Sequence, residues 1–151
     1  MGLSQTTQGI PMRQAGFETF EHGADIGVRG FGPSLEEAFA QGAKAVFELI
    51  YGDLEAGAEV QELTVEAEGY DLESLFVVWL NALLTQADIH GLALSSFEVS
   101  IDGFSLIARA RGEDRRIDPD SVGVEVKGAT YSQVAVFKEG GLWTAQCVVD
   151  V

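Results

Sequence analysis

The sequence contains only one cysteine and two histidines among 151 residues. A lone cysteine, Cys147, cannot form an internal disulfide, and its apolar surroundings predict a buried thiol in a reducing compartment. So few histidines and cysteines argue against a zinc site. The chain shows neither an N-terminal signal pattern nor an apolar run long enough to cross a bilayer. We therefore expect a cytoplasmic protein that does not associate with membranes.

Positive charge is also scarce. Nine Lys and Arg residues oppose 24 Asp and Glu residues, which gives a net charge of −15. Such a chain repels phosphate backbones, so direct nucleic-acid binding is not expected, whereas cations and basic protein surfaces are favoured partners. An acidic surface that only maintains solubility would carry the same charge. The sequence shows no Ser/His/Asp series, nucleophile elbow or phosphate loop, so it does not predict an enzyme.

Regular apolar patterns separated by glycine-rich breaks are present instead. Residues 1–16 have no apolar period and predict a flexible arm before a single domain at residues 17–151. Alternation predicts strands at residues 17–21, 25–31 and 59–68, and a period of 3.6 predicts helices at residues 35–50 and 72–90. Ser34 with Glu37 predicts a capping box on the first helix, and Asp71 predicts the cap of the second.

The remainder of the chain is predicted to be β-structure. Strands are expected at residues 97–101 and 104–110, around a two-residue turn at Asp102 and Gly103. A charged loop at residues 112–121 precedes a strand at residues 122–126, and a final hairpin joins residues 129–137 to residues 142–151. This order of elements predicts an α+β fold, a single compact domain in which two main helices pack on one side of a mostly antiparallel sheet.

Two carboxylates stand in apolar segments at opposite ends of the chain. Asp25 precedes Ile26 in a strand-like run, and Asp150 precedes the final residue, Val151. If the two segments lie side by side, Asp25, Asp150 and the terminal carboxylate of Val151 form an oxygen-rich site for Ca²⁺, Mg²⁺ or Mn²⁺. The alternative is that Asp25 caps a turn and that Asp150 frays at the chain end.

Two other polar residues are candidates for the same site. Lys127 is a cation within an apolar β segment, where it would neutralise the acidic site or bind a partner's carboxylate or phosphate. The alternative is a lysine on a solvated strand face. His22 is a candidate ligand or acid–base group, although a single histidine is more often a structural hydrogen-bonder.

Several segments resemble the archease family, in order, from residue 17 to residue 151. The run His22-Gly23-Ala24-Asp25-Ile26-Gly27 resembles the family's His-Thr-Ala-Asp-Ile-Gly signature. Its later blocks are similar to residues 34–39, 71–75, 79–84, 112–113 and 126–131, and to the ending Val149-Asp150-Val151. Gly23, Gly128 and Ser132 stand where Thr, Ala and His are usual, which weakens any role for position 132.

The resemblance implies a function. Archease is a non-catalytic protein cofactor of the GTP-dependent RNA ligase of tRNA splicing, and it promotes guanylylation and multiple turnover of that ligase. The family pattern implies a divalent metal ion bound by Asp25, Asp150 and Val151, and a functional role for Lys127. It also makes His22 and Glu113 candidates for partner contact. The oligomeric state is not defined by the sequence.

Two other classes of function remain open from the sequence. A stand-alone hydrolase dependent on a divalent metal ion would use the same carboxylates, but no convincing base or nucleophile accompanies them. A generic acidic adaptor or chaperone would need no metal ion at all. Turnover of nucleotides by the purified protein would favour the first class, and absence of metal binding would favour the second.

Overall fold

The structure is a computed structural model that describes residues 14–52, 60–115 and 123–151, and its strands form two antiparallel sheets. Sheet A has the order β1-β2-β8-β6, and β7 also pairs with β8. Its strands are β1 (Gly16–His22), β2 (Asp25–Gly32), β6 (Gly128–Ala129), β7 (Ala135–Glu139) and β8 (Leu142–Asp150). Sheet B has the order β3-β5-β4, with β3 (Gln61–Glu68), β4 (Leu92–Asp102) and β5 (Ser105–Asp114).

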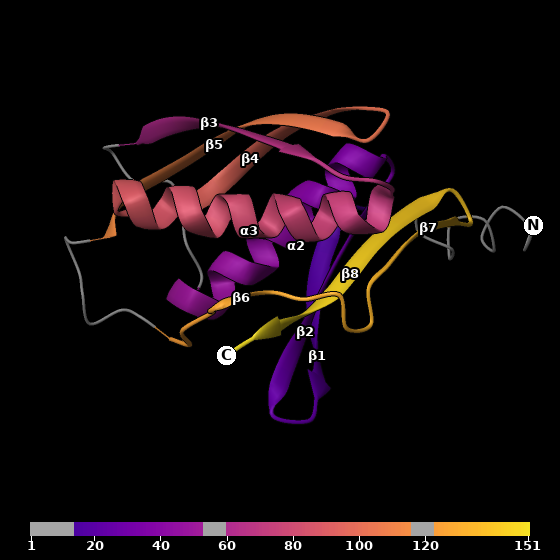
Figure 1. Ribbon diagram of the computed structural model, residues 1–151, viewed down its shortest axis with the longest axis horizontal. Helices are drawn as coiled ribbons and strands as arrows, with labels where there is room; N and C mark the ends of the chain where they lie inside the picture. The colour runs from indigo at the N-terminus through magenta and orange to yellow at the C-terminus, as the bar shows by residue number, and fades with distance from the viewer. Residues whose placement is uncertain (1–13, 53–59, 116–122) are drawn as a thin grey trace, which may run out of the picture.

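Two helices, α2 (Leu35–Tyr51) and α3 (Leu72–His90), lie between the sheets (Figure 1). Helix α2 packs on β2 of sheet A and β4 of sheet B, and α3 packs on β3 and β6. The helices contact each other through a buried hydrogen bond of 2.9 Å, in which Trp79 Nε1 donates to the carbonyl of Phe39. Phe39 also meets the edge of the Phe76 ring at 5.0 Å between centroids. The core therefore joins both sheets through the helices.

One close approach fixes how sheet A sits on α2. A Cβ placed on Gly30 would lie 2.2 Å from the backbone nitrogen of Gly42 and 2.3 Å from the carbonyl oxygen of Ala38. Only a residue without a side chain lets the backbone of β2 approach the helix this closely. The φ angle of Gly30 is not positive, so other residues could adopt its backbone conformation. Glycine is therefore required at this position by packing alone.

The predicted α+β fold with mostly antiparallel strands and two main helices is confirmed. The placement of both helices on one side of one sheet is wrong, because the strands divide into two sheets that cover the helices from both sides. Ser34 does cap α2, its hydroxyl accepting from the N–H of Glu37. The reciprocal capping box, however, occurs on α3, between Asp71 and Ser74.

Helix α3 corrects the expectation that no apolar segment is long enough to cross a bilayer. Its 19 residues are long and apolar enough to cross a membrane by length and composition alone. Core helices meet the same criterion, and α3 is buried between the sheets through residues that include Leu75, Trp79, Leu80 and Leu83. A helix covered by a sheet on two sides needs apolar residues around most of its circumference, which explains the composition.

Three predicted β segments differ from the structure. The β4–β5 turn consists of Gly103 and Phe104, because Asp102 pairs with Ser105. Residues 123–127 are not a strand, and residues 129–137 are divided between β6 and β7 by a turn. Residues 112–114 belong to β5. The expected N-terminal arm, most of the charged loop (residues 116–121) and the start of the strand expected at 59–68 lie outside the described residues.

Candidate functional site

A tight hairpin positions the first two candidates. Strands β1 and β2 are joined by Gly23 and Ala24, and Gly23 has a φ of 60°, which glycine adopts without strain. The register places His22 directly opposite Asp25. Directly paired residues of antiparallel strands point to the same face of a sheet, so these two side chains leave sheet A on one side. Both are half-buried.

Pairing of β2 with β8 brings the two chain ends together. Ile26 lies opposite Val149, so the next position along each strand belongs to Asp25 and Asp150. The backbone N–H of Val151 donates to Asp25 Oδ1 over 3.4 Å, a long hydrogen bond between residues 126 positions apart. In Figure 1 the C-terminus accordingly lies beside β2. The structure thus places the terminal residue against the first aspartate.

Lys127, which directly precedes β6, is held in this region by its backbone. The N–H of Lys127 donates to the carbonyl of Asp150 over 2.8 Å, and Gly128 pairs with Asp150 in the sheet. Asn81 of α3 fixes the strand from the other side. Its amide donates to the carbonyl of Ala129 over 3.1 Å, and its carbonyl accepts from the N–H of Ala129 over 2.9 Å. Asn81 therefore holds β6 in place, a role that the sequence analysis missed although Asn81 interrupts an otherwise apolar helix face.

The Lys127 side chain is exposed and lines a groove of about 720 Å³. The groove lies between the C-terminal turns of the two helices, and its walls include Tyr51 and Leu84. Arg115 closes part of it, donating to Asp88 over 3.0 Å. Hydrogen bonding to the side chain of Tyr51, and then to Asp88, raises the pKa of the Arg115 guanidinium. Lys127 thus connects the region of Asp150 to a partly apolar depression.

Glu113 is not brought to the same place. It lies on β5 of sheet B, opposite Ala93, and is half-buried. Within the described ranges it forms no hydrogen bond or ion pair with Asp25, Asp150 or Lys127. The structure therefore separates Glu113 from the other candidates by assigning it to the second sheet.

The outer face of sheet A is held by a network centred on Arg29. Its Nε donates to Gln146 Oε1 over 2.8 Å, and its terminal nitrogen pairs with Glu18. The guanidinium also lies 4.6 Å from the centre of the Phe20 ring. Gln146 in turn donates to the carbonyl of Gln133 over 3.0 Å. The network links β1, β2 and β8 to the turn after β6. The sequence analysis did not predict it, although Arg29 is a single cation in a glycine-rich strand.

The donor set fits a hard divalent cation. Asp25, Asp150 and the terminal carboxylate of Val151 supply only oxygen, which Ca²⁺, Mg²⁺ and Mn²⁺ prefer. No group of three His, Cys, Asp or Glu side chains with metal-binding geometry occurs in the residues that the structure describes. The hydrogen bond from the Val151 N–H to Asp25 makes the carboxylate of Val151 a candidate oxygen ligand beside the two aspartates.

The buried thiol of Cys147 has low reactivity. It lies on β8 in the hydrophobic core, and desolvation raises the pKa of its thiol to about 12. A thiol with so high a pKa contains almost no thiolate at neutral pH, so it is a poor metal ligand and a poor nucleophile. The prediction of a buried thiol is confirmed.

Comparison with known proteins identifies the family. Residues 17–151 match the archease protein family. The chain belongs to the archease family. It is 44% identical over 143 residues to the protein archease of Pyrococcus abyssi, covering 89% of this chain and 98% of that protein. It is 40% identical over 146 residues to the archease of Pyrococcus furiosus, covering 93% and 100%.

Solved structures agree with this archease assignment. The solution structure of Methanobacterium thermoautotrophicum protein 1598 superposes with a TM-score of 0.71 at 32% identity, covering 90% of this chain and 99% of that chain. A crystal structure from Thermotoga maritima, described as an archease and possible chaperone, gives a TM-score of 0.56 at 22% identity, covering 93% and 98%. The second likeness supports the archease fold alone, and the resemblance seen in the sequence is confirmed at the level of the family.

Proposed function

We propose that this protein is a non-catalytic, metal-binding cofactor or chaperone of a GTP-dependent RNA ligase, and that it works in the cytoplasm. In this proposal it promotes guanylylation and multiple turnover of the ligase during tRNA splicing or RNA repair. One observation carries the metal part of the proposal. The chain terminus lies against Asp25, so that two aspartates and a terminal carboxylate from opposite ends of the chain occupy one edge of sheet A.

Membership of the archease family supports the partner. The sequence carries the family's blocks from residue 17 to the end, and relatives in the family are named archease. A net charge of −15 is consistent with a basic protein surface as the partner, because RNA alone would be repelled. The protein would therefore act on the ligase rather than on its RNA.

The residues at the site have separate tasks in this proposal. Asp25, Asp150 and the Val151 carboxylate would hold the ion, which when bound supplies positive charge to stabilise a phosphoryl-transfer reaction. Lys127 is joined to Asp150 through its backbone and lines the neighbouring groove, where its ammonium group can bind a carboxylate or phosphate of the partner complex. His22 lies opposite Asp25 and can orient its carboxylate by hydrogen bonding. Pre-positioned charges of this kind need no rearrangement when the partner binds.

The direct test measures guanylylation of the purified ligase with Asp25→Asn and Asp150→Asn variants. Each variant removes a charged ligand at nearly constant size, so we expect stimulation to fall about tenfold or more while the fold is retained. Calorimetric titration with Mn²⁺, Mg²⁺ and Ca²⁺ should show the heat of binding lost in the same variants. Glu139→Gln, an exposed carboxylate on β7, is the matched control and should behave like the parent protein.

Extension of the chain gives a second, independent test. Addition of Gly-Ser after Val151 moves the terminal carboxylate away from Asp25 and should weaken metal binding and stimulation together. The same dipeptide added at the N-terminus controls for a tag effect. Unchanged metal binding with the C-terminal extension would remove the terminus from the ligand set. Full stimulation by the Asp25→Asn variant would contradict the proposal, and nucleotide turnover without the ligase would favour a hydrolase.

A further inference from the structure

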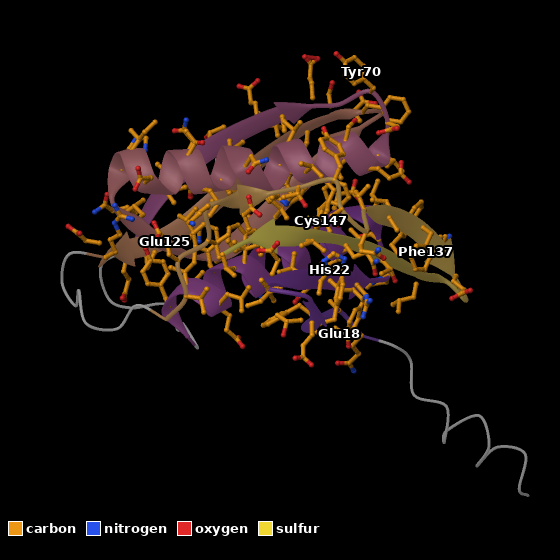
Figure 2. All side chains as sticks on the ribbon, turned by 60° about the horizontal axis from the view of Figure 1, so that its bottom comes forward. Glu18, His22, Tyr70, Glu125, Phe137 and Cys147 are labelled. Carbon is orange, nitrogen blue, oxygen red and sulfur yellow. The ribbon has the colours of Figure 1, made fainter. Side chains whose placement is uncertain are left out.

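Two exposed aromatic residues lie on adjoining turns at one end of sheet B, away from the candidate metal site. Tyr70 is 94% exposed and Phe104 is 49% exposed. Their turns are joined by a backbone hydrogen bond of 3.0 Å from the N–H of Gly69 to the carbonyl of Phe104. In Figure 2 Tyr70 projects from the edge of the molecule opposite to the side on which His22 and Glu18 lie. Single exposed apolar residues are ordinary, but neighbouring aromatic side chains on two adjoining turns need a reason.

These aromatic side chains contribute little to folding, but hydrogen bonds and a tight turn fix the backbone that carries them. The N–H of Tyr70 donates to Ser74 Oγ over 2.8 Å, just before the capping box that begins α3. Phe104 follows Gly103, whose φ of 64° forms the tight β4–β5 turn. Aromatic side chains have only two rotatable bonds, so rings carried on hydrogen-bonded turns lose comparatively little entropy when they bind a partner. The arrangement is that of a preformed contact surface.

The charged residues that the strand register and the helix cap place beside these two turns are acidic. Glu68 and Asp102 lie on either side of Ser105 in the sheet, and Asp71 caps the adjoining helix. All three are exposed, and Glu68 and Asp102 form no ion pair within the described residues. Hydrogen bonding from the backbone and hydroxyl of Ser74 lowers the pKa of Asp71, which keeps it ionised. The nearest cation by register is Arg109, four residues beyond Ser105 and thus roughly 13 Å along the strand.

We propose that this aromatic tip, defined as Tyr70 and Phe104 with the rim Glu68, Asp71 and Asp102, is a docking site for an arginine-bearing segment of a partner protein. A guanidinium stacks on an aromatic face and donates paired hydrogen bonds to a carboxylate, and the tip presents both groups together. Lysine matches this arrangement less well, because its ammonium is compact and strongly hydrated. The acidic rim repels nucleic acid and anionic lipid surfaces.

The test uses the full chain and two synthetic peptides. One peptide has three arginines separated by Gly-Ser, and the other has lysine at the same positions. In ¹H–¹⁵N spectra, the arginine peptide should shift the amides of residues 68–71 and 102–105, and the lysine peptide should bind several-fold more weakly. The double variant Tyr70→Ala/Phe104→Ala should bind the arginine peptide about tenfold more weakly, since each exposed cation–π contact contributes about three- to fivefold.

Matched controls separate the tip from the general acidity of the protein. Tyr131→Ala removes another exposed tyrosine, 58% accessible, and Glu139→Gln removes another exposed carboxylate. Both variants should bind the arginine peptide like the parent protein. Shifts spread over the whole acidic surface, or binding unchanged in the double variant, would overturn the proposal. So would concentration-dependent shifts of the tip amides without peptide, because a second copy of the chain would then be the occupant.

Discussion

The two sheets of this protein are built in different ways. Sheet B comes from one continuous part of the sequence, residues 61–114, and its central pairing is a local hairpin between β4 and β5. Sheet A instead pairs β2, near the start, with β8, at the end. All the candidate metal ligands lie on sheet A or at its end, whereas sheet B carries the aromatic tip. A site made from distant segments depends on the whole fold, and one made from adjacent turns depends on local structure.

The largest expected loss of stability concerns the close packing of β2 in sheet A against α2. Gly30→Ala places a Cβ within 2.3 Å of helix backbone, which cannot rotate away as a side chain can. We expect about 3 kcal/mol or more of lost stability, measured by chemical denaturation, together with weaker metal binding because β2 carries Asp25. Gly128→Ala is the control. Its Cβ would meet only the Asn81 side chain, at 3.2 Å, and should cost well under half as much. Equal effects of the two variants would contradict this account.

Removal of the helix-to-strand connection should have the next largest effect. Asn81→Ala leaves the N–H and the carbonyl of Ala129 without their partner on α3, at a cost of about 2 kcal/mol. Because Lys127 lies only two residues before Ala129, loss of this anchor should also move Lys127, so we expect ligase stimulation to fall. Ala82→Ser, a neighbouring half-buried position on α3, is a control for general damage to the helix. A stable Asn81→Ala variant with full stimulation would show that β6 is held by β8 alone.

The outer faces of the sheets offer a smaller contrast. Arg29 on sheet A contacts Glu18, Gln146 and the Phe20 ring, so Arg29→Ala removes several interactions at once. We expect a loss of about 1–2 kcal/mol in the free energy of unfolding, measured by urea denaturation. Arg29→Lys retains the charge but cannot reproduce the planar contacts, so it should recover only part of the loss. Full recovery by lysine would mean that charge alone matters there.

Local patterns predicted most elements of the fold. The predicted helix at residues 72–90 has the bounds of α3, and most residues of its predicted apolar face are buried. The alternation of β3 gives Val65 and Ala67 as its buried positions. The β4–β5 turn was misplaced because either register keeps the same side chains facing inward. In the structure β5 also pairs with β3, and Ala67 of β3 lies opposite Leu106. That information lies in a third strand and cannot be obtained from the hairpin sequence.

Other features could not be predicted because the relevant partner is distant in the sequence. Alternating valines suggested a strand at residues 122–126, yet the N–H groups of Gly123 and Val124 donate to carbonyls at the end of α2. A helix end has free carbonyls that compete with strands for such donors. For the candidate site, each aspartate could be found individually. Their proximity required either the family resemblance or the register of β2 with β8, and the metal ion itself remains a prediction.

The smallest expected effect belongs to the ion pair on sheet B. Arg111 Nε lies 3.0 Å from Glu62 Oε1, and both side chains are more than 40% exposed, so water screens their attraction. A double-mutant cycle with Arg111→Ala and Glu62→Ala should give a coupling energy of about 0.5 kcal/mol or less, which falls further at high salt. The corresponding cycle for Arg29 and Glu18 should give a larger and less salt-dependent value, because Arg29 is also held by Gln146 and Phe20. Equal couplings in the two cycles would mean that the network on sheet A adds nothing beyond an ordinary surface pair. The outer face of sheet A, the sheet that carries the candidate metal site, would then be no more firmly held than the solvent-exposed face of sheet B.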